Sequence, residues 1–494
     1  MAVFFSHGAP VAIVFDLHEE MIVTIEKALE AYAANRHDGV DRLVEWLSIP
    51  SISTDPAYRD ECRRGGQWLV DQLTEIGLDA KLETTPGHPI VWARTTNPEA
   101  HGPHILFYGH YDVQPADPLE KWKSPPFEPA IVDGPHGKRV VARGAVDDKG
   151  QVMTFIEALR AWKDATGSIP CPVTVIVEGE EESASVNLDA FLERAKARLV
   201  GNEARPKPCD LVVVSDTGMW DINTPAITTS LRGLLYLEVT VHGPSHDLHS
   251  GMAGGAVPNP ANELARVIGE IHDENRRVTI DAFYDDVVEL TPEQRREWAS
   301  LEFDEAAYLS DMGVSEARGE RDFSTLERQW ARPTCDVNGI YGGYTGVGAK
   351  TIIPSHASAK ISFRLVPDQR PEKIESAFKQ WFESRLPRGL QTEWRSHGSG
   401  RAYRVEPNSP YLQTARSSLE RATGVKPVNI GSGGSIPVVE SIKQTLGLDT
   451  LLIGFGLADD RVHSPNEKFE LRCFEMGAQS HIVLLGEFAK LGGE

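Results

Sequence analysis

Cysteine and positive charge are both scarce in this sequence of 494 residues. The five cysteines lie far apart and form no C-x-x-C pair, which excludes a dense disulfide framework and a cysteine-based zinc site. Fifty basic residues stand against 72 acidic ones, and the resulting formal net charge of −22 repels phosphate backbones and anionic lipid. We therefore expect no nucleic-acid partner and no membrane partner, and we expect a reducing, cytoplasmic location.

Long apolar runs are also missing, and no stretch is long enough to span a membrane. The first 20 residues, MAVFFSHGAPVAIVFDLHEE, lack the basic start and the continuous apolar segment of a secretory signal, so we expect a poorly ordered extension or a start-site artefact. A single hydrophobic core usually stops growing at roughly 250 to 300 residues. The chain is therefore expected to form two domains.

The first part of the chain alternates short apolar runs with helical patterns. The runs at 90–93, 105–108, 173–177 and 211–214 suit strands that are buried on both faces, and a similar run returns at 451–455. This pattern predicts an α/β fold with a mostly parallel sheet and helices on both faces. The predicted domain is discontinuous, and its two parts are residues 1–229, of which 1–20 are expected to be disordered, and residues 403–494.

Residues 230–402 have a different pattern. Leu235, Leu237, Val239 and Val241 alternate with polar neighbours, as in strands with one exposed face, and helical patterns follow such strands. We predict an inserted α+β domain of two layers. Within it, the charge-rich segment at about 273–332 is predicted to be a helical insertion, to which the sequence assigns no role.

Acidic and histidine side chains gather in the loops of the first domain. Four loops follow predicted buried strands, and a fifth precedes the helix that begins near Val152; together they carry His110, Asp112, Asp147, Asp148, Glu181, Glu182, Asp216 and His463. The carboxyl ends of strands in an open α/β sheet form a ligand crevice, so these loops are expected to converge. Nitrogen and oxygen ligands without a thiolate suit Zn²⁺ or Mn²⁺.

Each of these residues also has an ordinary structural explanation. An aspartate before a helix is commonly an N-cap, and a run of glutamates such as Glu178, Glu180, Glu181 and Glu182 is commonly a solvated turn. Four carboxylates within 178–182 repel one another unless a cation or a set of donors meets them. The whole set favours a metal site, while Glu178 and Glu180 are expected to lie in solvent or to support the site from outside.

Seven stretches in this order and spacing identify a resemblance: GHYDVQP, ARGAVDDKG, VEGEEESAS, SDTGMW, DLHSG, GAKTIIP and HSPNEKF. They resemble the M20 family of di-metal peptidases, and most closely its carnosinase-like dipeptidase branch, from about Val40 onward. The resemblance implies a hydrolase with two divalent metal ions per subunit, with zinc as the first choice and manganese or cobalt as alternatives. It assigns one metal to His110, Asp147 and Asp216, and the other to Asp147, Glu182 and His463.

The same resemblance implies further roles. Asp112 orients His110, and Glu181 is the general base that takes a proton from the catalytic water. His249 reaches the active site of a partner subunit, which makes the inserted domain a lid and dimerisation domain of a homodimer. The substrate carboxylate is held by Arg364, Thr351, Asn338 and Ser435.

The implied activity is the hydrolysis of dipeptides or similar short peptides with a free C-terminal carboxylate. An N-acyl amino acid deacylase or a carboxypeptidase of the same fold is the alternative, and Asp216 favours a dipeptidase because the deacylases and carboxypeptidases of the family tend to have Glu there. A non-catalytic binding module is a third reading, against which the intact metal-ligand set argues. Ser432 stands where the branch usually has an acidic residue, which leaves recognition of the substrate amine open.

Overall fold

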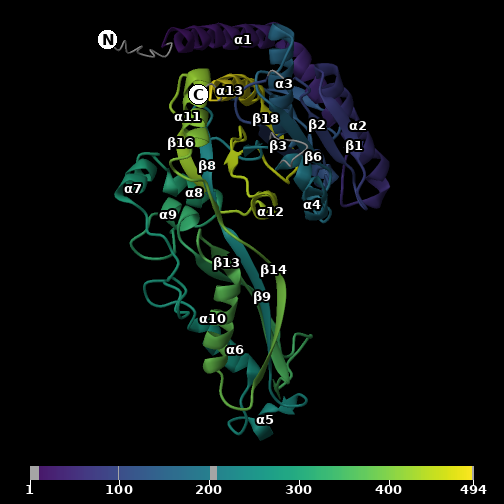
Figure 1. Cartoon of the computed structure of the whole chain (residues 1–494). Helices are drawn as coiled ribbons and strands as arrows, with labels where there is room; N and C mark the ends of the chain where they lie inside the picture. The colour runs from purple at the N-terminus through teal and green to yellow at the C-terminus, as the bar shows by residue number, and fades with distance from the viewer. Residues whose placement is uncertain (1–10, 98–99, 201–207, 492–494) are drawn as a thin grey trace, which may run out of the picture. The chain divides into compact units, whose positions relative to one another are not determined.

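The computed structural model describes residues 11–97, 100–200 and 208–491, and the chain divides into two compact units (Figure 1). Unit 1 runs to Thr228 and includes Val405–Asn429 and the residues from Ser441 onward; unit 2 comprises Thr229–Arg404 and Ile430–Glu440. The predicted boundaries placed 430–440 in the first domain. These residues belong to unit 2 because the backbone oxygens of Gly433 and Gly434 accept hydrogen bonds from Arg232, at 3.0 and 3.2 Å.

The core of unit 1 is a mixed sheet with the strand order β1-β2-β6-β3-β7-β17-β8. The strands are β1 Asp79–Glu83, β2 Ile90–Arg94, β3 Ile105–His110, β6 Val173–Glu178, β7 Leu211–Val214, β8 Ala226–Leu231 and β17 Thr450–Leu452. The neighbours from β6 to β17 are parallel, and the outer pairs on both sides are antiparallel. The predicted α/β fold is confirmed, with antiparallel strands at both edges of the parallel centre.

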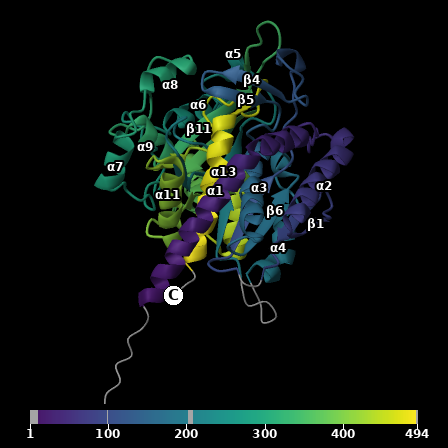
Figure 2. The same ribbon diagram turned by 90° about the horizontal axis from the view of Figure 1, so that it is seen from above.

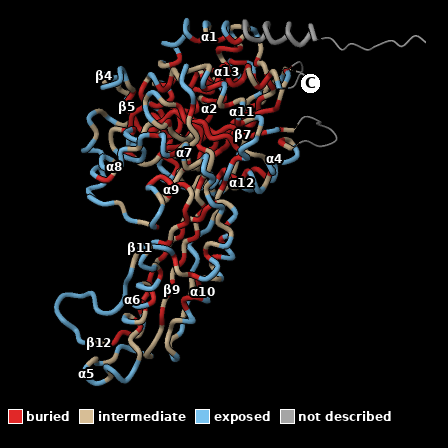
Figure 3. Tube along the Cα trace, turned by 90° about the vertical axis from the view of Figure 1, so that its left-hand side faces the viewer, coloured by how far each residue is buried: buried red, intermediate tan, exposed pale blue. Residues whose placement is uncertain are grey.

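Helices cover the sheet of unit 1. They are α1 Val11–Leu47, α2 Arg59–Ile76, α3 Lys149–Thr166, α4 Leu188–Leu199, α11 Pro410–Thr423 and α13 Leu471–Lys490. Figure 2 shows α1 crossing α3 and α13, which it contacts. The aromatic ring of Phe155 in α3 stacks on that of Phe107 in β3, with 3.9 Å between ring centroids. Because β3 and β6 are buried at all six of their positions, the centre of the sheet is covered on both faces (Figure 3).

The N-terminal segment differs in part from the prediction. Residues 1–10 lie outside the described residues, whereas residues 11–20 form the beginning of α1 instead of a separate extension. Later in α1, the guanidinium of Arg42 donates two hydrogen bonds to the buried carboxylate of Glu157 in α3, at 2.8 and 2.6 Å. This ion pair anchors α1 to the sheet-covering layer. Among the described residues, no helix is both long and apolar enough to cross a membrane.

Unit 2 contains an antiparallel sheet of four strands in the order β11-β13-β9-β14. Its strands are β9 Gly233–His242, β11 Thr334–Gly342, β13 His356–Leu365 and β14 Gln391–Gly400, and its covering helices are α6 Pro260–Gly269 and α10 Pro371–Ser384. Alternate residues of β9 are buried, and they pack with Phe363 and with Phe378 and Trp381 of α10 into one core. The predicted two-layer arrangement is present.

The segment at 273–332 contains three short helices, α7 Pro292–Ala299, α8 Glu305–Asp311 and α9 Thr325–Trp330. Local sequence signals fix where two of them begin, because Thr291 with Gln294 and Ser324 with Glu327 form capping boxes. Further short elements of unit 2 are β10 Leu248–His249, α5 Ser250–Ala253, β12 Ile352–Ile353 and β15 Tyr403–Arg404, and the segment Ile430–Glu440 includes the end of β16 Val428–Ser432 and the beginning of α12 Pro437–Leu446. β10 and β12 pair in an antiparallel ladder.

We predict that Phe378→Ala lowers the free energy of unfolding by about 3 to 5 kcal/mol, because it leaves a cavity in the core of unit 2. Phe378 is fully buried and its ring contacts those of Phe363, Phe382 and Trp394. Urea denaturation followed by tryptophan fluorescence measures the change. The exposed neighbour Gln380 provides the control, and equal effects of Phe378→Ala and Gln380→Ala would contradict the assignment of this core.

Candidate metal centre

The carboxyl ends of the parallel strands carry the predicted site residues. His110 is the last residue of β3, Asp216 follows β7, and Glu181 and Glu182 lie in the short turn Glu181–Ser183 after β6. His463 lies between β17 and the small strand β18, Lys468–Glu470. Because β6, β3, β7 and β17 run in the same direction, their following loops open at one edge of the sheet.

Five of these residues form two overlapping groups. One group is His110, Asp147 and Asp216, the other is Asp147, Glu182 and His463, and the candidate ligand atoms within each group all lie within 4.8 Å of one another. Asp147 belongs to both: its Oδ1 is 3.1 Å from His110 Nε2, and its Oδ2 is 2.9 Å from His463 Nε2. The structure thus brings together the whole set of residues that the sequence indicated as ligands, with one carboxylate shared.

The electrostatics of the cluster call for positive charge. Burial raises the pKa of Asp216, and the neighbouring carboxylate of Asp147 raises it further. Burial also opposes ionisation of Asp147, but the imidazoles of His110 and His463, which face its two oxygens, hold the pKa of its carboxyl below the usual range. Hydrogen bonds to Asp147 and Glu182 raise the pKa of His463 to about 10. The carboxylates of the two groups are therefore stabilised by positive charge placed close to them.

The position of His110 tests whether these residues fit a metal ion. Its Nε2 is buried and has no hydrogen-bond partner in the described part of the chain, although it faces Asp147. Its other nitrogen, Nδ1, lies 3.1 Å from the backbone oxygen of Asp112 and 3.5 Å from the Asp112 carboxylate. A histidine fixed through one nitrogen, with the other aimed at carboxylates, has the arrangement of a metal ligand. The donor set therefore fits a divalent cation.

Asp112 connects the histidine to the glutamate turn. Its carboxylate is fully buried and accepts hydrogen bonds from the backbone nitrogens of Glu181, at 3.2 Å, and Glu182, at 3.0 Å. The side-chain amide of Gln114 donates to Glu182 Oε2 at 2.7 Å. Within the described part of the chain, no donor contacts the Glu181 side chain, and burial raises the pKa of its carboxyl. One aspartate thus positions both His110 and the two adjacent glutamates.

Glu178 and Glu180 are buried. Of the two alternatives expected for them, a position in solvent is therefore wrong, whereas support of the site from outside agrees with their contacts. Glu178 accepts hydrogen bonds from the hydroxyls of Tyr108 and Ser185, and burial raises the pKa of its carboxyl to about 8. Glu180 accepts from the backbone nitrogen of His88 at 3.0 Å and from the Asn187 amide at 2.7 Å. Both carboxyl groups fasten the turn to neighbouring segments, and each has donors of its own, which explains how four glutamates fit within 178–182.

Two further acidic residues support the site: Glu467, which was not among the predicted residues, and Asp148, which was predicted to lie in the cluster without a role of its own. Glu467, in the stretch HSPNEKF, is fully buried and accepts from the backbone nitrogens of Gly144, Val146 and Asp147, at 3.0 to 3.1 Å, while Arg143 pairs with it at 2.8 Å. Its position in the sequence, four residues after the predicted ligand His463, is the feature that could have indicated its role. Asp148 accepts from the backbone nitrogen of His110 at 3.2 Å, and burial raises its pKa well above the usual range. These contacts hold the loop of Asp147 in place.

The residues predicted to bind substrate all lie in unit 2. Arg364 on β13 donates a hydrogen bond to Ser435 Oγ at 3.2 Å, so these two are together. His249 and Thr351 are also near each other, because β10 pairs with β12 and the backbone nitrogen of Ser250 donates to Thr351 at 3.0 Å. Asn338 is exposed at an irregularity in β11, four residues along the strand from Thr334, the partner of Arg364 in the ladder. The structure does not gather the four into one group.

Known proteins resemble the chain in sequence and in fold. The family model of peptidase family M20/M25/M40 matches residues 106–486. A Cys-Gly metallodipeptidase of Schizosaccharomyces pombe is 31% identical over 487 residues, which cover 95% of this chain and 100% of the relative. The crystal structure of human carnosine dipeptidase 1 has a TM-score of 0.73 at 28% identity, covering 94% of this chain and 99% of that one.

A third comparison is with an M20 family metallo-carboxypeptidase from Sulfolobus solfataricus, whose crystal structure has a TM-score of 0.75 at 31% identity. It covers 91% of this chain and 99% of the solved chain. The likeness thus extends across both units, and the family model spans the loops that carry the clustered histidines and carboxylates. The family expected from the seven sequence stretches is confirmed, and this chain belongs to peptidase family M20/M25/M40.

Proposed function

We propose that this protein is a metal-dependent dipeptidase, which hydrolyses the peptide bond of dipeptides or similar short peptides with a free C-terminal carboxylate. The observation that carries the proposal is the pair of ligand groups around Asp147, in which five residues form two groups that have the Asp147 carboxylate in common. The similarity to a Cys-Gly metallodipeptidase and to a carnosine dipeptidase over nearly the whole chain supports the substrate class.

The proposed cofactors are two divalent metal ions per subunit. His110, Asp147 and Asp216 would hold one, and Asp147, Glu182 and His463 the other. Imidazole and carboxylate donors suit Zn²⁺, with Mn²⁺ and Co²⁺ as alternatives. When bound, such a pair would polarise the scissile carbonyl and lower the pKa of a bound water molecule.

Glu181 is proposed to be the general base. Its carboxyl belongs to neither ligand group, and burial raises its pKa, which makes it a better proton acceptor than an exposed glutamate. It would take a proton from the attacking water and pass it to the leaving amine. Asp112 would position Glu181 as the base and Glu182 as a ligand, because its carboxylate accepts hydrogen bonds from both of their backbone nitrogens.

A carboxypeptidase or an N-acyl amino acid deacylase remains the second candidate. The likeness to a metallo-carboxypeptidase at 31% identity favours it, whereas Asp216 in place of Glu favours the dipeptidase. We further propose a cytoplasmic location, which the five free, buried cysteines support.

Removal of metal should abolish hydrolysis of dipeptides, and added Zn²⁺, Mn²⁺ or Co²⁺ should restore it, because the attacking water is activated only when the ligand groups are filled. The assay compares dipeptides, N-acyl amino acids and longer peptides after chelator treatment and reconstitution. Full activity in a protein shown to be metal-free would refute the mechanism. Turnover of N-acyl amino acids alone would instead support the second candidate.

Substitutions of the adjacent residues Glu181 and Glu182 should have different effects on activity and on metal binding. Glu181→Gln should keep both metals and lose about 10²- to 10⁴-fold in kcat, as expected for loss of a general base. Glu182→Gln should weaken one metal, so that part of the activity returns at high metal concentration. Metal analysis and steady-state kinetics distinguish the two.

The matched control is Glu178→Gln. Because burial raises the pKa of Glu178 to about 8, its carboxyl is mostly neutral at neutral pH, and a neutral amide should change kcat only modestly. Equally mild effects of Glu178→Gln, Glu181→Gln and Glu182→Gln would show that the turn is not catalytic.

We also propose a homodimer formed through unit 2, with His249 completing the active site of the partner. His249 is exposed, and its Nδ1 accepts a hydrogen bond from the backbone nitrogen of Gly251 at 3.0 Å. The proton of the neutral ring is therefore on Nε2, which is left as a donor for a developing oxyanion.

His249→Ala should lower kcat strongly without weakening metal binding, because the residue stabilises charge from the other subunit. Mixing His249→Ala with Glu181→Ala protein under subunit exchange should regenerate activity, since some sites then contain both residues. Sedimentation gives the oligomeric state. A fully active monomer, or no recovery of activity in exchanged heterodimers, would contradict the proposal.

A further inference from the structure

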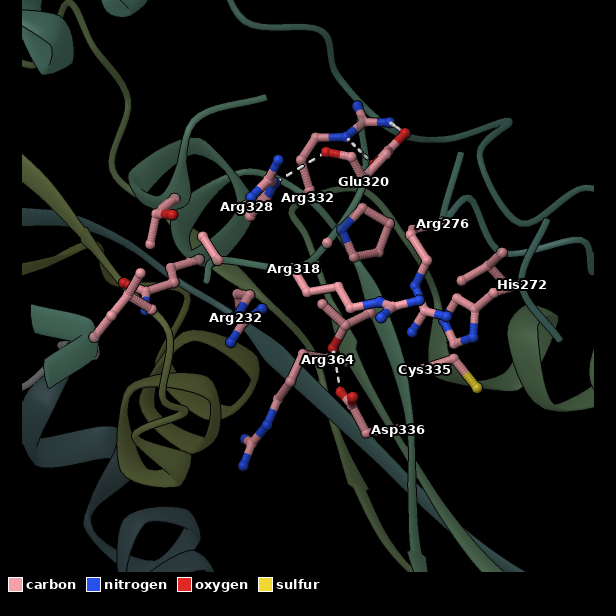
Figure 4. A pocket seen from close by; sticks show the side chains of 18 of the residues that line it. Arg232, His272, Arg276, Arg318, Glu320, Arg328, Arg332, Cys335, Asp336 and Arg364 are labelled. Carbon is pink, nitrogen blue, oxygen red and sulfur yellow. Dashed lines mark hydrogen bonds and ion pairs between the residues drawn. The ribbon is translucent and has the colours of Figure 1, made fainter. Parts of the chain in front are cut away.

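Unit 2 contains a pocket of about 440 Å³ whose lining is rich in arginine (Figure 4). Six arginines contribute to it, which is unexpected in a chain with a formal net charge of −22. Four of them, Arg276, Arg318, Arg328 and Arg332, come from the segment at 273–332, for which the sequence indicated no role. The pocket is of a size that ordinarily holds a small molecule.

Two of the six arginines are occupied by structural contacts. Arg332 is buried and forms two hydrogen bonds with the carboxylate of Glu320, both at 2.8 Å. Arg328 donates to the backbone oxygen of Glu320 at 2.9 Å, and Arg277, outside the lining, pairs with the same carboxylate at 2.7 Å. Glu320 is thus saturated by its neighbours and does not neutralise the other arginines of the pocket.

The other four arginines are without a carboxylate partner in the described part of the chain. Arg232 donates to the backbone oxygen of Gly433, and Arg364 donates to the hydroxyl of Ser435, both uncharged acceptors. The guanidinium groups of Arg276 and Arg318 form no ion pair within the described residues. Apart from Glu320, the lining has one carboxylate, that of Asp336, which accepts a hydrogen bond from the Thr334 hydroxyl at 2.9 Å.

Arg232 and His272 each lie close to a positively charged arginine of the pocket. Burial and the positive charge of Arg364 lower the pKa of Arg232 to about 10. Burial and the positive charge of Arg276 likewise lower the pKa of His272. Asp336 opposes both effects without removing them. Like charges are therefore held close together around a cavity, and an anion in that cavity would relieve their repulsion.

The backbone at Arg276 supports a built site. Arg276 has a φ of 62°, a left-handed conformation that arginine rarely adopts, and its nitrogen donates to the backbone oxygen of Asp273 at 3.0 Å. Figure 4 shows the Arg276 and Arg318 side chains among those that line the pocket, with His272 beside them. Backbone strain of this kind is retained where the surrounding structure fixes it, often at ligand sites.

We propose that this pocket binds a small oxyanion with two acid groups, one held by Arg232 and Arg364 and the other by Arg276 and Arg318. The planar guanidinium fork matches a carboxylate or a phosphate. A dicarboxylate, such as a peptide with an acidic residue, and a phosphorylated acid share this chemistry. The residues of the site all belong to unit 2. Arg364 is also a residue predicted to hold the substrate carboxylate, so this inference rests in part on the proposed function, whereas the end formed by Arg276 and Arg318 lies outside the predicted substrate-binding set.

Calorimetric titration of the metal-loaded protein with glutarate and with 3-phosphoglycerate tests the proposal, and acetate is the single-acid control. At least one diacid should bind, about 10-fold or more tighter than acetate, because both ends of the pocket are engaged. The diacid that binds with the higher affinity shows whether the pocket prefers a dicarboxylate or a phosphorylated acid. Absence of binding of both diacids at about 10 mM would overturn the proposal.

The double variant Arg276→Gln/Arg318→Gln should weaken the diacid by about 100-fold or more, since each lost charge-assisted contact costs about 10-fold. The control is Arg321→Gln/Arg388→Gln, which removes the same charge from exposed positions of unit 2 outside the lining. It should leave affinity nearly unchanged. Equal weakening by both double variants would mean general charge attraction and would refute the site.

Circular dichroism and the melting midpoint confirm that each variant folds. Arg318→Gln alone is the second variant, because Arg318 is exposed and makes no side-chain contact that stabilises the fold within the described residues. It should weaken the diacid by about 10-fold while leaving acetate unaffected. Unchanged diacid affinity in this variant would also overturn the proposal.

Discussion

Repulsion among buried carboxylates around Asp147 is the constraint on which the organisation of unit 1 depends. The carboxyl groups of the cluster are stabilised in several ways. Asp112 and Glu180 receive hydrogen-bond donors, the pKa of Glu178 is raised to about 8 so that it can hold a proton, and Asp147 lies between two histidines. The negative charge of the two groups that share Asp147 is not fully compensated by these contacts. A bound metal cation would supply the missing positive charge.

The candidate ligands also have to be positioned accurately by the surrounding backbone. Parallel strands deliver His110, Glu181 and Asp216 to one edge, but strand direction alone does not fix side chains to the accuracy that ligation requires. Asp112 and Glu467 supply that accuracy through hydrogen bonds to backbone nitrogens of the glutamate turn and of the Asp147 loop. Both are fully buried carboxylates, so their loss would leave several backbone donors unpaired in the interior.

Unit 2 presents the opposite electrostatic problem. Its pocket gathers arginines whose positive charge exceeds that of the neighbouring acids, in a chain that is strongly acidic as a whole. Arg332 has a structural role, and its charge is neutralised by Glu320 in a buried ion pair with two hydrogen bonds. Arg276 and Arg318 lack any comparable partner among the described residues. The contrast between paired and unpaired arginines within one pocket is the physical basis for expecting an anionic ligand there.

The sequence by itself determined the α/β and α+β architecture, because hydrophobic periodicity is a local property of the chain. The family followed from the resemblance carried by seven motif stretches, and that resemblance also implied the five candidate ligands. The sequence did not determine the state of Glu178 and Glu180, the part played by Glu467, or the place of 430–440 in unit 2. Only tertiary structure decided these, as it decided the arginine pocket. Burial and pairing depend on residues far apart in the chain, such as Asp147 and Glu467, and no local pattern encodes them.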